Sequence, residues 1–149
     1  MTKMDTKVLA KLIRMTKGKL PVARVGILGR TNSRDGKKGN AEIGAKHEFG
    51  HEGMPVRSFL RVPIAEHYKE YLQKSGAFDE DAIKNALAEG TLVPWMKKVG
   101  IIAEAIVSDG FDTGGFGKWE PSNMEIKKNK QTLVETQQLR NSITSEVVE

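Results

Sequence analysis

His47, Glu48 and His51 are the residues whose types and spacing could support catalysis, because residues 47–51, HEFGH, match the HExxH pattern. In zinc hydrolases this spacing places two imidazoles on one face of a helix, and the glutamate acts as general base beside a metal-bound water. One interpretation of the chain is therefore a zinc metallopeptidase that uses these three residues.

The residues around the motif argue against a metal-binding helix. Gly50 lies inside the supposed helix, at a cost of about 1 kcal/mol relative to alanine, and Gly53 and Pro55 prevent its continuation past His51. A third ligand is not defined, since the acidic and histidine side chains downstream are equally expected on the solvent face of the next helix: Glu66, His67 and Glu70. We therefore expect the HExxH match to be accidental, with no metal, no cofactor and no enzymatic activity.

A second interpretation reads residues 47–61 as a glutamate-bearing turn and a short loop followed by MPVRSFLR. The C-terminal part has a glycine-rich approach at residues 110–117, then Trp119-Glu120-Pro121-Ser122 and a lysine cluster, then LVET at 133–136, Leu139 and Ser142-Ile143. This order resembles the virion morphogenesis proteins of tailed phages, the Mu-like tail-completion and neck family. The resemblance spans about residues 25–147, with two departures: Gln137 stands where the family usually has glycine, and Ile126 where threonine is common.

The resemblance implies a structural protein that acts by assembly at the head-to-tail junction of a virion. It would be made in the host cytoplasm and would form a homo-oligomeric ring, or ring-associated subunits, that contacts connector or head-closure, tail-terminator or tail-tube proteins. The side chains that we expect at such interfaces are Arg57, Phe59, Arg61, Trp119, Lys127 and Lys128. Two alternatives stay open: the two arginines could pair within the chain, for instance with Glu48 or Glu52, and Trp119 could be an internal anchor.

Length and composition favour one domain over residues 1–149, in a soluble and intracellular protein. The absence of cysteine excludes disulfides and thiolate metal sites. No apolar run approaches the ~20 residues that span a bilayer, and the first residues lack the apolar core of a signal peptide. We expect no membrane partner.

The charge is unevenly distributed along the chain. Residues 1–50 carry 12 Lys and Arg against 4 Asp and Glu, residues 51–100 carry 7 of each, and residues 101–149 carry 5 against 8. The basic first third can approach phosphate or an acidic protein face, or it can be a solvated surface. Because no aromatic residue precedes Phe49, stacking on single-stranded bases is not expected there. A basic DNA-binding module is a further alternative, and nonspecific proximity to DNA in a virion is compatible with the leading interpretation.

The pattern of apolar residues predicts an α+β fold, with a small antiparallel sheet packed against a few helices and long partner-binding loops. We expect a basic amphipathic helix over residues 5–16 and a strand over 22–28, in which Gly26 marks a bulge or close packing. A flexible polar loop should follow at about 30–40, and then a short helix that Asn40 caps.

Further helices are expected over residues 58–72, with Pro63 in the first turn, from Asp79 to the break at Gly90, and over 94–108, which has the best core face. A long loop should span 109–132. Residues 138–148 could close the sheet as a strand, or form a helix.

Overall fold

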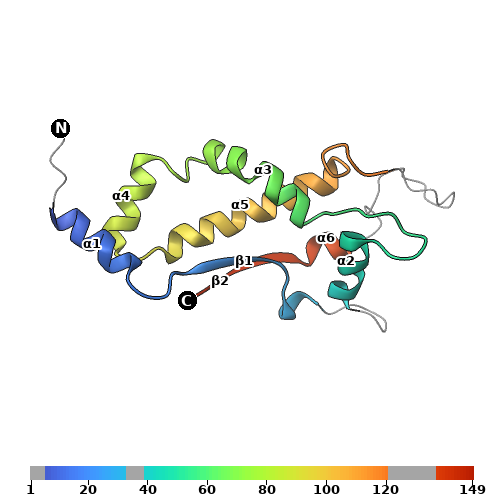
Figure 1. Ribbon diagram of the computed structural model, residues 1–149, viewed down its shortest axis with the longest axis horizontal. Coiled ribbons are helices and arrows are strands. Elements are labelled where there is room, and N and C mark those ends of the chain that lie inside the picture. Colours follow the sequence, from blue (N-terminus) through green and yellow to red (C-terminus); the bar gives the residue numbers. More distant parts are fainter. Residues whose placement is uncertain (1–5, 33–38, 121–136) are drawn as a thin grey trace.

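The computed structural model describes residues 6–32, 39–120 and 137–149 of the chain. In these ranges the protein has six α-helices and a two-stranded sheet, arranged as an elongated body (Figure 1). The elements are α1 (Thr6–Thr16), β1 (Val22–Ile27), the 3-10 helix η1 (Gly29–Thr31), α2 (Asn40–Phe49), α3 (Arg61–Lys74), α4 (Glu80–Glu89), α5 (Val93–Asp112), α6 (Gln137–Asn141) and β2 (Ile143–Val148). The expected α+β class is confirmed.

The sheet pairs the first strand with the last. β1 and β2 are antiparallel, with Val22 opposite Val148 and Ile27 opposite Ile143. Helix α5 packs against both strands, and α3 packs against α5, so that α5 lies between the sheet and α3 (Figure 1). The long apolar helix predicted from its three-to-four residue spacing is thus the central element of the fold.

The core lies at the C-terminal half of α5. The buried cluster comprises Phe59, Val107, Phe111 and Leu139, and the rings of Phe59 and Phe111 are 5.2 Å apart. These residues come from the segment before α3, from α5 and from α6, so the cluster joins parts of the chain that are far apart in sequence.

At the opposite end, α1 packs against α4 (Figure 1). The Lys11 ammonium donates a 3.2 Å hydrogen bond to the Ala88 carbonyl, one of the carbonyls that the C-terminal turn of α4 leaves without a helical partner. The loop before α4 is held by Trp95, whose indole N–H donates to the Ala77 carbonyl at 2.7 Å.

Helix α3 is also fixed to α5 by a polar contact. The Tyr71 hydroxyl donates a hydrogen bond to Asp109 Oδ2. This hydrogen bond, with burial as a second cause, raises the pKa of Tyr71 to about 12, because the phenol must give up its proton to ionise.

Several local expectations are confirmed, and two are refined. Strand β1 follows the predicted range, and Pro63 lies in the first turn of α3. The pairing of β1 with β2 continues without interruption through Gly26, so this glycine does not mark a bulge; its φ of 151° is a conformation that favours glycine. A Cβ atom there would lie 3.7 Å from Leu60 Cδ2. The C-terminal segment contains both alternatives, first α6 and then β2.

The predicted cap of α2 is wrong. Gly39 is the N-cap, and Asn40 is the first residue of the helix. Asn32 performs the capping role instead, because its Oδ1 accepts the Ala41 N–H at 2.7 Å. The Asn40 side chain points back to donate to the Thr31 carbonyl at 2.9 Å, which fixes the start of α2 against η1.

The boundaries of both predicted loops also require correction. The first loop contains η1 at its start, and residues 33–38 of it lie outside the described residues. In the second, α5 continues to Asp112, because Gly110 and Phe111 are buried and continue its core face. Residues 113–119 then form turns, while 121–136 lie outside the described residues. Among the described helices, none is both long enough and apolar enough to cross a membrane.

Candidate functional site

The segment that carries the HExxH pattern is a chain reversal. Helix α2 ends at Phe49, and Gly50 adopts a φ of 79°, which favours glycine. The chain then turns back through a bridge between His51 and Met54. The Arg57 N–H donates to the His47 carbonyl at 2.8 Å. As a result, residues 58–61 lie beside the last turn of α2.

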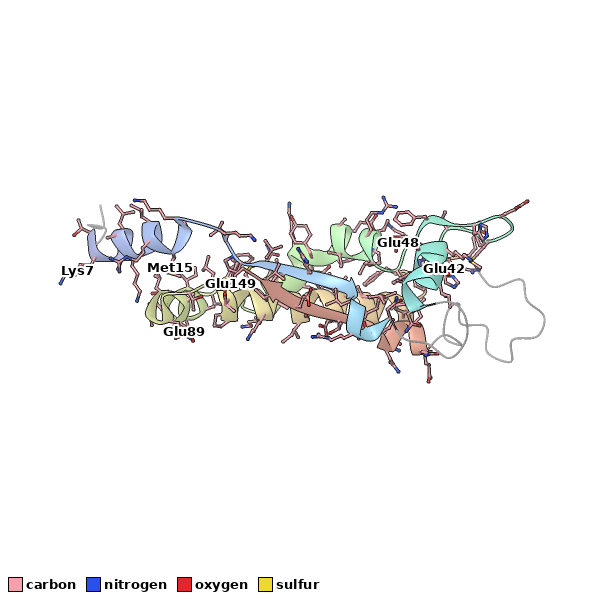
Figure 2. The ribbon with its side chains drawn as sticks, turned by 90° about the horizontal axis from the view of Figure 1, so that it is seen from below. Lys7, Met15, Glu42, Glu48, Glu89 and Glu149 are labelled. Atoms are coloured by element: carbon pink, nitrogen blue, oxygen red, sulfur yellow. The ribbon has the colours of Figure 1, made fainter. Side chains whose placement is uncertain are left out.

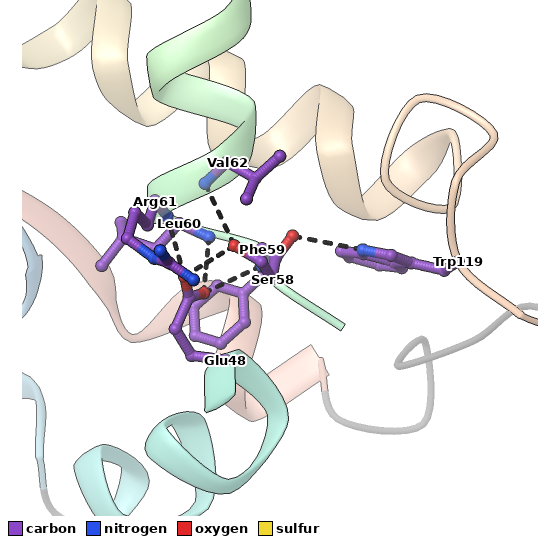
Figure 3. Close-up of polar contacts among 7 residues, drawn as sticks. All are labelled: Glu48, Ser58, Phe59, Leu60, Arg61, Val62 and Trp119. Carbon is purple, nitrogen blue, oxygen red and sulfur yellow. Dashed lines mark hydrogen bonds and ion pairs between the residues drawn. The ribbon is translucent and has the colours of Figure 1, made fainter. Parts of the chain in front are cut away.

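The carboxylate of Glu48 organises this reversal (Figure 3). Its Oε1 accepts the Ser58 hydroxyl at 2.6 Å and the Arg61 N–H at 3.1 Å. Its Oε2 accepts the N–H groups of Phe59 and Leu60, each at 3.0 Å. Glu48 is 4% exposed, so these interactions are shielded from water.

These four hydrogen bonds use the acceptor capacity of the carboxylate, which has about four lone-pair directions. The backbone donors lie at the start of α3, where N–H groups have no partner within the helix and the helix dipole favours negative charge. Glu48 therefore caps α3 from a different helix, and it is not available as a general base.

The two imidazoles of the motif are also separated by the break in the helix. His47 belongs to the last turn of α2, whereas His51 lies beyond Gly50 in the reversal. No group of three His, Cys, Asp or Glu side chains with metal-binding geometry occurs in residues 6–32, 39–120 and 137–149. The arrangement provides neither the continuous helix nor the free glutamate that zinc hydrolysis through HExxH requires.

The two arginines expected at an interface have different environments. Arg61 Nε is 3.6 Å from Glu48 Oε1, its guanidinium lies 5.7 Å from the centre of the Phe49 ring, and its side chain is 65% exposed. Arg57 is buried; its Nη2 donates to the Glu120 carbonyl at 3.3 Å. The intrachain pairing with Glu48, one of the two alternatives, thus occurs for Arg61, and only Arg61 of the pair reaches the surface.

Phe59 belongs to the monomer core, and Trp119 is partly buried and packs against that core. The Trp119 indole N–H donates to the Ser58 carbonyl at 3.2 Å (Figure 3), and its ring meets Phe111 edge-on with centroids 5.8 Å apart. Gly115 lies so close to the indole that a Cβ atom there would collide with it. Of the two alternatives for Trp119, these contacts support the internal anchor: the partly buried side chain holds its own loop against the core. Phe59 is 2% exposed and cannot serve as a surface contact.

The reversal exposes apolar side chains that sequence reasoning did not select. Phe49 is 66% exposed and Val56 is 58% exposed, at either end of the turn at residues 50–55. Phe49 borders a hollow of about 260 Å³ with Leu60 and Arg61, and Val56 borders one of about 160 Å³ next to Trp119. The glycines and proline of this turn were the available signal, because a tight turn carries its flanking side chains to the surface. Lys127 and Lys128 lie outside the described residues.

No family model, curated protein or solved structure matches this chain.

Proposed function

We propose that this chain is a structural protein of a tailed-phage virion. It would act at the head-to-tail junction as a tail-completion or neck component, and would assemble with itself and with connector or tail-terminator rings. The sequence order from residue 47 to residue 143 supports the family assignment, and the chemistry around Glu48 supports assembly over catalysis.

The observation that carries an assembly role is the distribution of exposed apolar side chains. Exposed large apolar side chains occur on several elements, and two groups of them lie at opposite ends of the elongated body: Phe49 and Val56 at the reversal, and Leu9 and Ile13, 38% and 44% exposed, on α1 (Figure 1). Large exposed apolar side chains that gather at defined places mark contact surfaces. Two different contact surfaces at opposite ends suit heterologous contacts, which can close into a ring.

For the basic N-terminal third we propose a protein partner and not DNA. Contacts to phosphate need cations, yet α1 also presents Leu9 and Ile13, which phosphate would leave exposed. Purified protein should therefore show little affinity for duplex DNA even at low salt, as measured by fluorescence anisotropy, whereas weak, sequence-independent and salt-dependent binding would indicate that this region approaches DNA. A tight and sequence-selective complex would support the DNA-binding module instead.

The proposed function is tested by inactivating the gene in a phage that carries it. Electron microscopy of the lysate should show DNA-filled heads and separate tails, and a plasmid copy of the gene should restore joined, infectious particles. Lysates that contain joined and infectious particles without the gene product would contradict the proposal.

Complementation by variants then tests the contact surface. Phe49→Glu combined with Val56→Glu should yield a folded protein that fails to join heads and tails, because charge replaces the exposed apolar contacts. Gln73→Glu adds the same kind of charge at an exposed position of α3 and should complement normally. Normal complementation by the double variant would show that the reversal is not the contact surface.

A further inference from the structure

Helix α1 has an apolar face that the described part of the chain leaves partly uncovered. Leu9 and Ile13 are four residues apart and share one face; they are 38% and 44% exposed. Lys17 follows Ile13 by a further four residues. No acidic residue occurs in residues 6–24, whereas that range carries Lys7, Lys11, Arg14, Lys17, Lys19 and Arg24. The uncovered face is therefore both apolar and basic.

Helix α4 presents the complementary combination. Ile83 is 48% exposed. Glu80 precedes it by three residues on the same helical face, and Asp79 is the N-cap residue just before Glu80. Glu80 forms an exposed ion pair with Lys84 at 2.6 Å. The acidic side chains at and within α4 still outnumber this single lysine: Asp79, Glu80, Asp81 and Glu89.

Within one chain, α1 and α4 do not contact each other through these two faces. Lys11 reaches the last turn of α4, through its bond to the Ala88 carbonyl and its approach to Gly90. Ile83 lies toward the other end of α4 and keeps nearly half of its surface exposed. Each copy of the chain therefore offers one basic apolar face and one acidic apolar face at the same end of the body (Figure 2).

We propose that α1 of one copy docks on α4 of a second copy. Leu9 and Ile13 would cover Ile83, and Lys17 would lie near Asp79 and Glu80. The apolar contact would supply most of the affinity, while the opposite charges orient the two helices. This inference rests on the self-assembly in the proposed function and names the surfaces for it; its tests measure self-association in solution, so they can fail while head-to-tail joining still requires the gene product.

The charge of α4 selects a protein partner over other surfaces that bind basic amphipathic helices. An anionic membrane or a nucleic acid would attract α1. It would also bring its negative charge against the acids of α4, which packs beside α1 in the same chain. A second copy avoids this repulsion, because the acidic side chains of its α4 pair with the basic side chains of α1.

The docking is tested by cross-linking between single-cysteine chains, for which the absence of cysteine in the natural sequence gives a clean background. Ile13→Cys protein is mixed with mass-tagged Ile83→Cys protein under mild oxidation. The mixed disulfide should form at least several-fold faster than in a control mixture of Ile13→Cys with Ile101→Cys. Ile101 is an appropriate control because it is also apolar and is 63% exposed, but lies on α5. Equal rates in the two mixtures would overturn the proposal.

The mass of the unmodified chain in solution provides a second measurement. Light scattering at about 100 μM should show a dimer or a larger assembly, Ile13→Glu should shift it to the monomer, and Ile101→Glu should leave it unchanged. Circular dichroism verifies that Ile13→Glu remains folded. The proposal is overturned if the natural chain is a monomer at this concentration. It is also overturned if α1 binds anionic vesicles or duplex DNA and not a second copy of the chain.

Discussion

The Ser58 hydroxyl donates a 2.6 Å hydrogen bond to Glu48 Oε1, and the same hydroxyl accepts the Val62 N–H at 3.0 Å. The Ser58 carbonyl in turn accepts the Trp119 indole N–H. One buried serine thus connects the end of α2, the start of α3 and the segment after α5. Glu48 of the HExxH pattern thus connects α2 to the start of α3. Its hydrogen bonds hold the backbone between residues 48 and 62 in one conformation.

Glu48 should be among the most important polar residues for stability. Glu48→Ala leaves one hydroxyl and three backbone N–H groups without their acceptor, so we expect the free energy of unfolding to fall by about 3 to 5 kcal/mol. Glu48→Gln should cost somewhat less, since one acceptor oxygen remains. Urea denaturation measures both changes. Glu42→Gln, in the exposed first turn of the same helix, is the control and should change stability by less than about 0.5 kcal/mol; similar values for Glu48→Gln and Glu42→Gln would contradict the capping role.

Trp119 should behave as an internal residue. Trp119→Ala removes the contact with Phe111 and the hydrogen bond to Ser58, and should lower the free energy of unfolding by about 2 to 4 kcal/mol. Trp119→Phe keeps a ring and loses the hydrogen bond, at a cost of about 1 kcal/mol. Phe49→Ala, at an exposed aromatic, should leave the thermal melting temperature almost unchanged. If Trp119→Ala melts like the natural chain, the tryptophan does not anchor the loop.

The regular elements were predictable because they depend on local spacing. The recurrence of Trp95, Val99, Ile102 and Ile106 predicted α5, and Gly90 and Pro63 marked a helix end and a helix start correctly. The continuation of α5 to Asp112 was missed because the glycines beyond it suggested a loop. Gly110 and Phe111 are buried on the core face of α5, and a Cβ atom at Gly110 would be in ordinary van der Waals contact with Pro63 Cγ at 3.5 Å.

The candidate site was less predictable because its contacts join residues distant in sequence. The bond between Trp119 and Ser58 spans 61 residues, and no local pattern distinguishes an anchoring tryptophan from an interface tryptophan. Val56 and Phe59 are close in sequence but differ completely in burial, at 58% and 2% exposed. The direction of each side chain depends on how the turn after Gly50 returns the chain to Glu48.

The contact between Tyr71 and Asp109 should make stability depend on alkaline pH. Tyr71 has a pKa raised from 10.0 to about 12 in the folded chain. The stabilisation is therefore fully present below pH 10 and is lost as the pH rises toward 12. Tyr71→Phe should cost about 1 to 2 kcal/mol at pH 8, and this difference from the natural chain should shrink above pH 10 in urea denaturation.

Absorbance titration provides an independent measurement of the same contact. Ionisation of tyrosine near pH 12 should disappear in Tyr71→Phe and persist in Tyr68→Phe. A difference in stability that stays constant between pH 8 and pH 11.5 would show that the hydrogen bond to Asp109 does not hold the phenol in its neutral form.

The HExxH match should bind no zinc with useful affinity. Glu48 is saturated by the hydrogen bonds from Ser58 and the start of α3, and α2 ends before His51. Protein equilibrated with one equivalent of zinc and then dialysed should contain well under one zinc per chain by elemental analysis. His47→Ala with His51→Ala should give the same low value as the natural chain. Stoichiometric zinc in the natural chain that is lost in this double variant would show that residues 47–51 rearrange into a metal-binding helix. It would support the zinc metallopeptidase alternative.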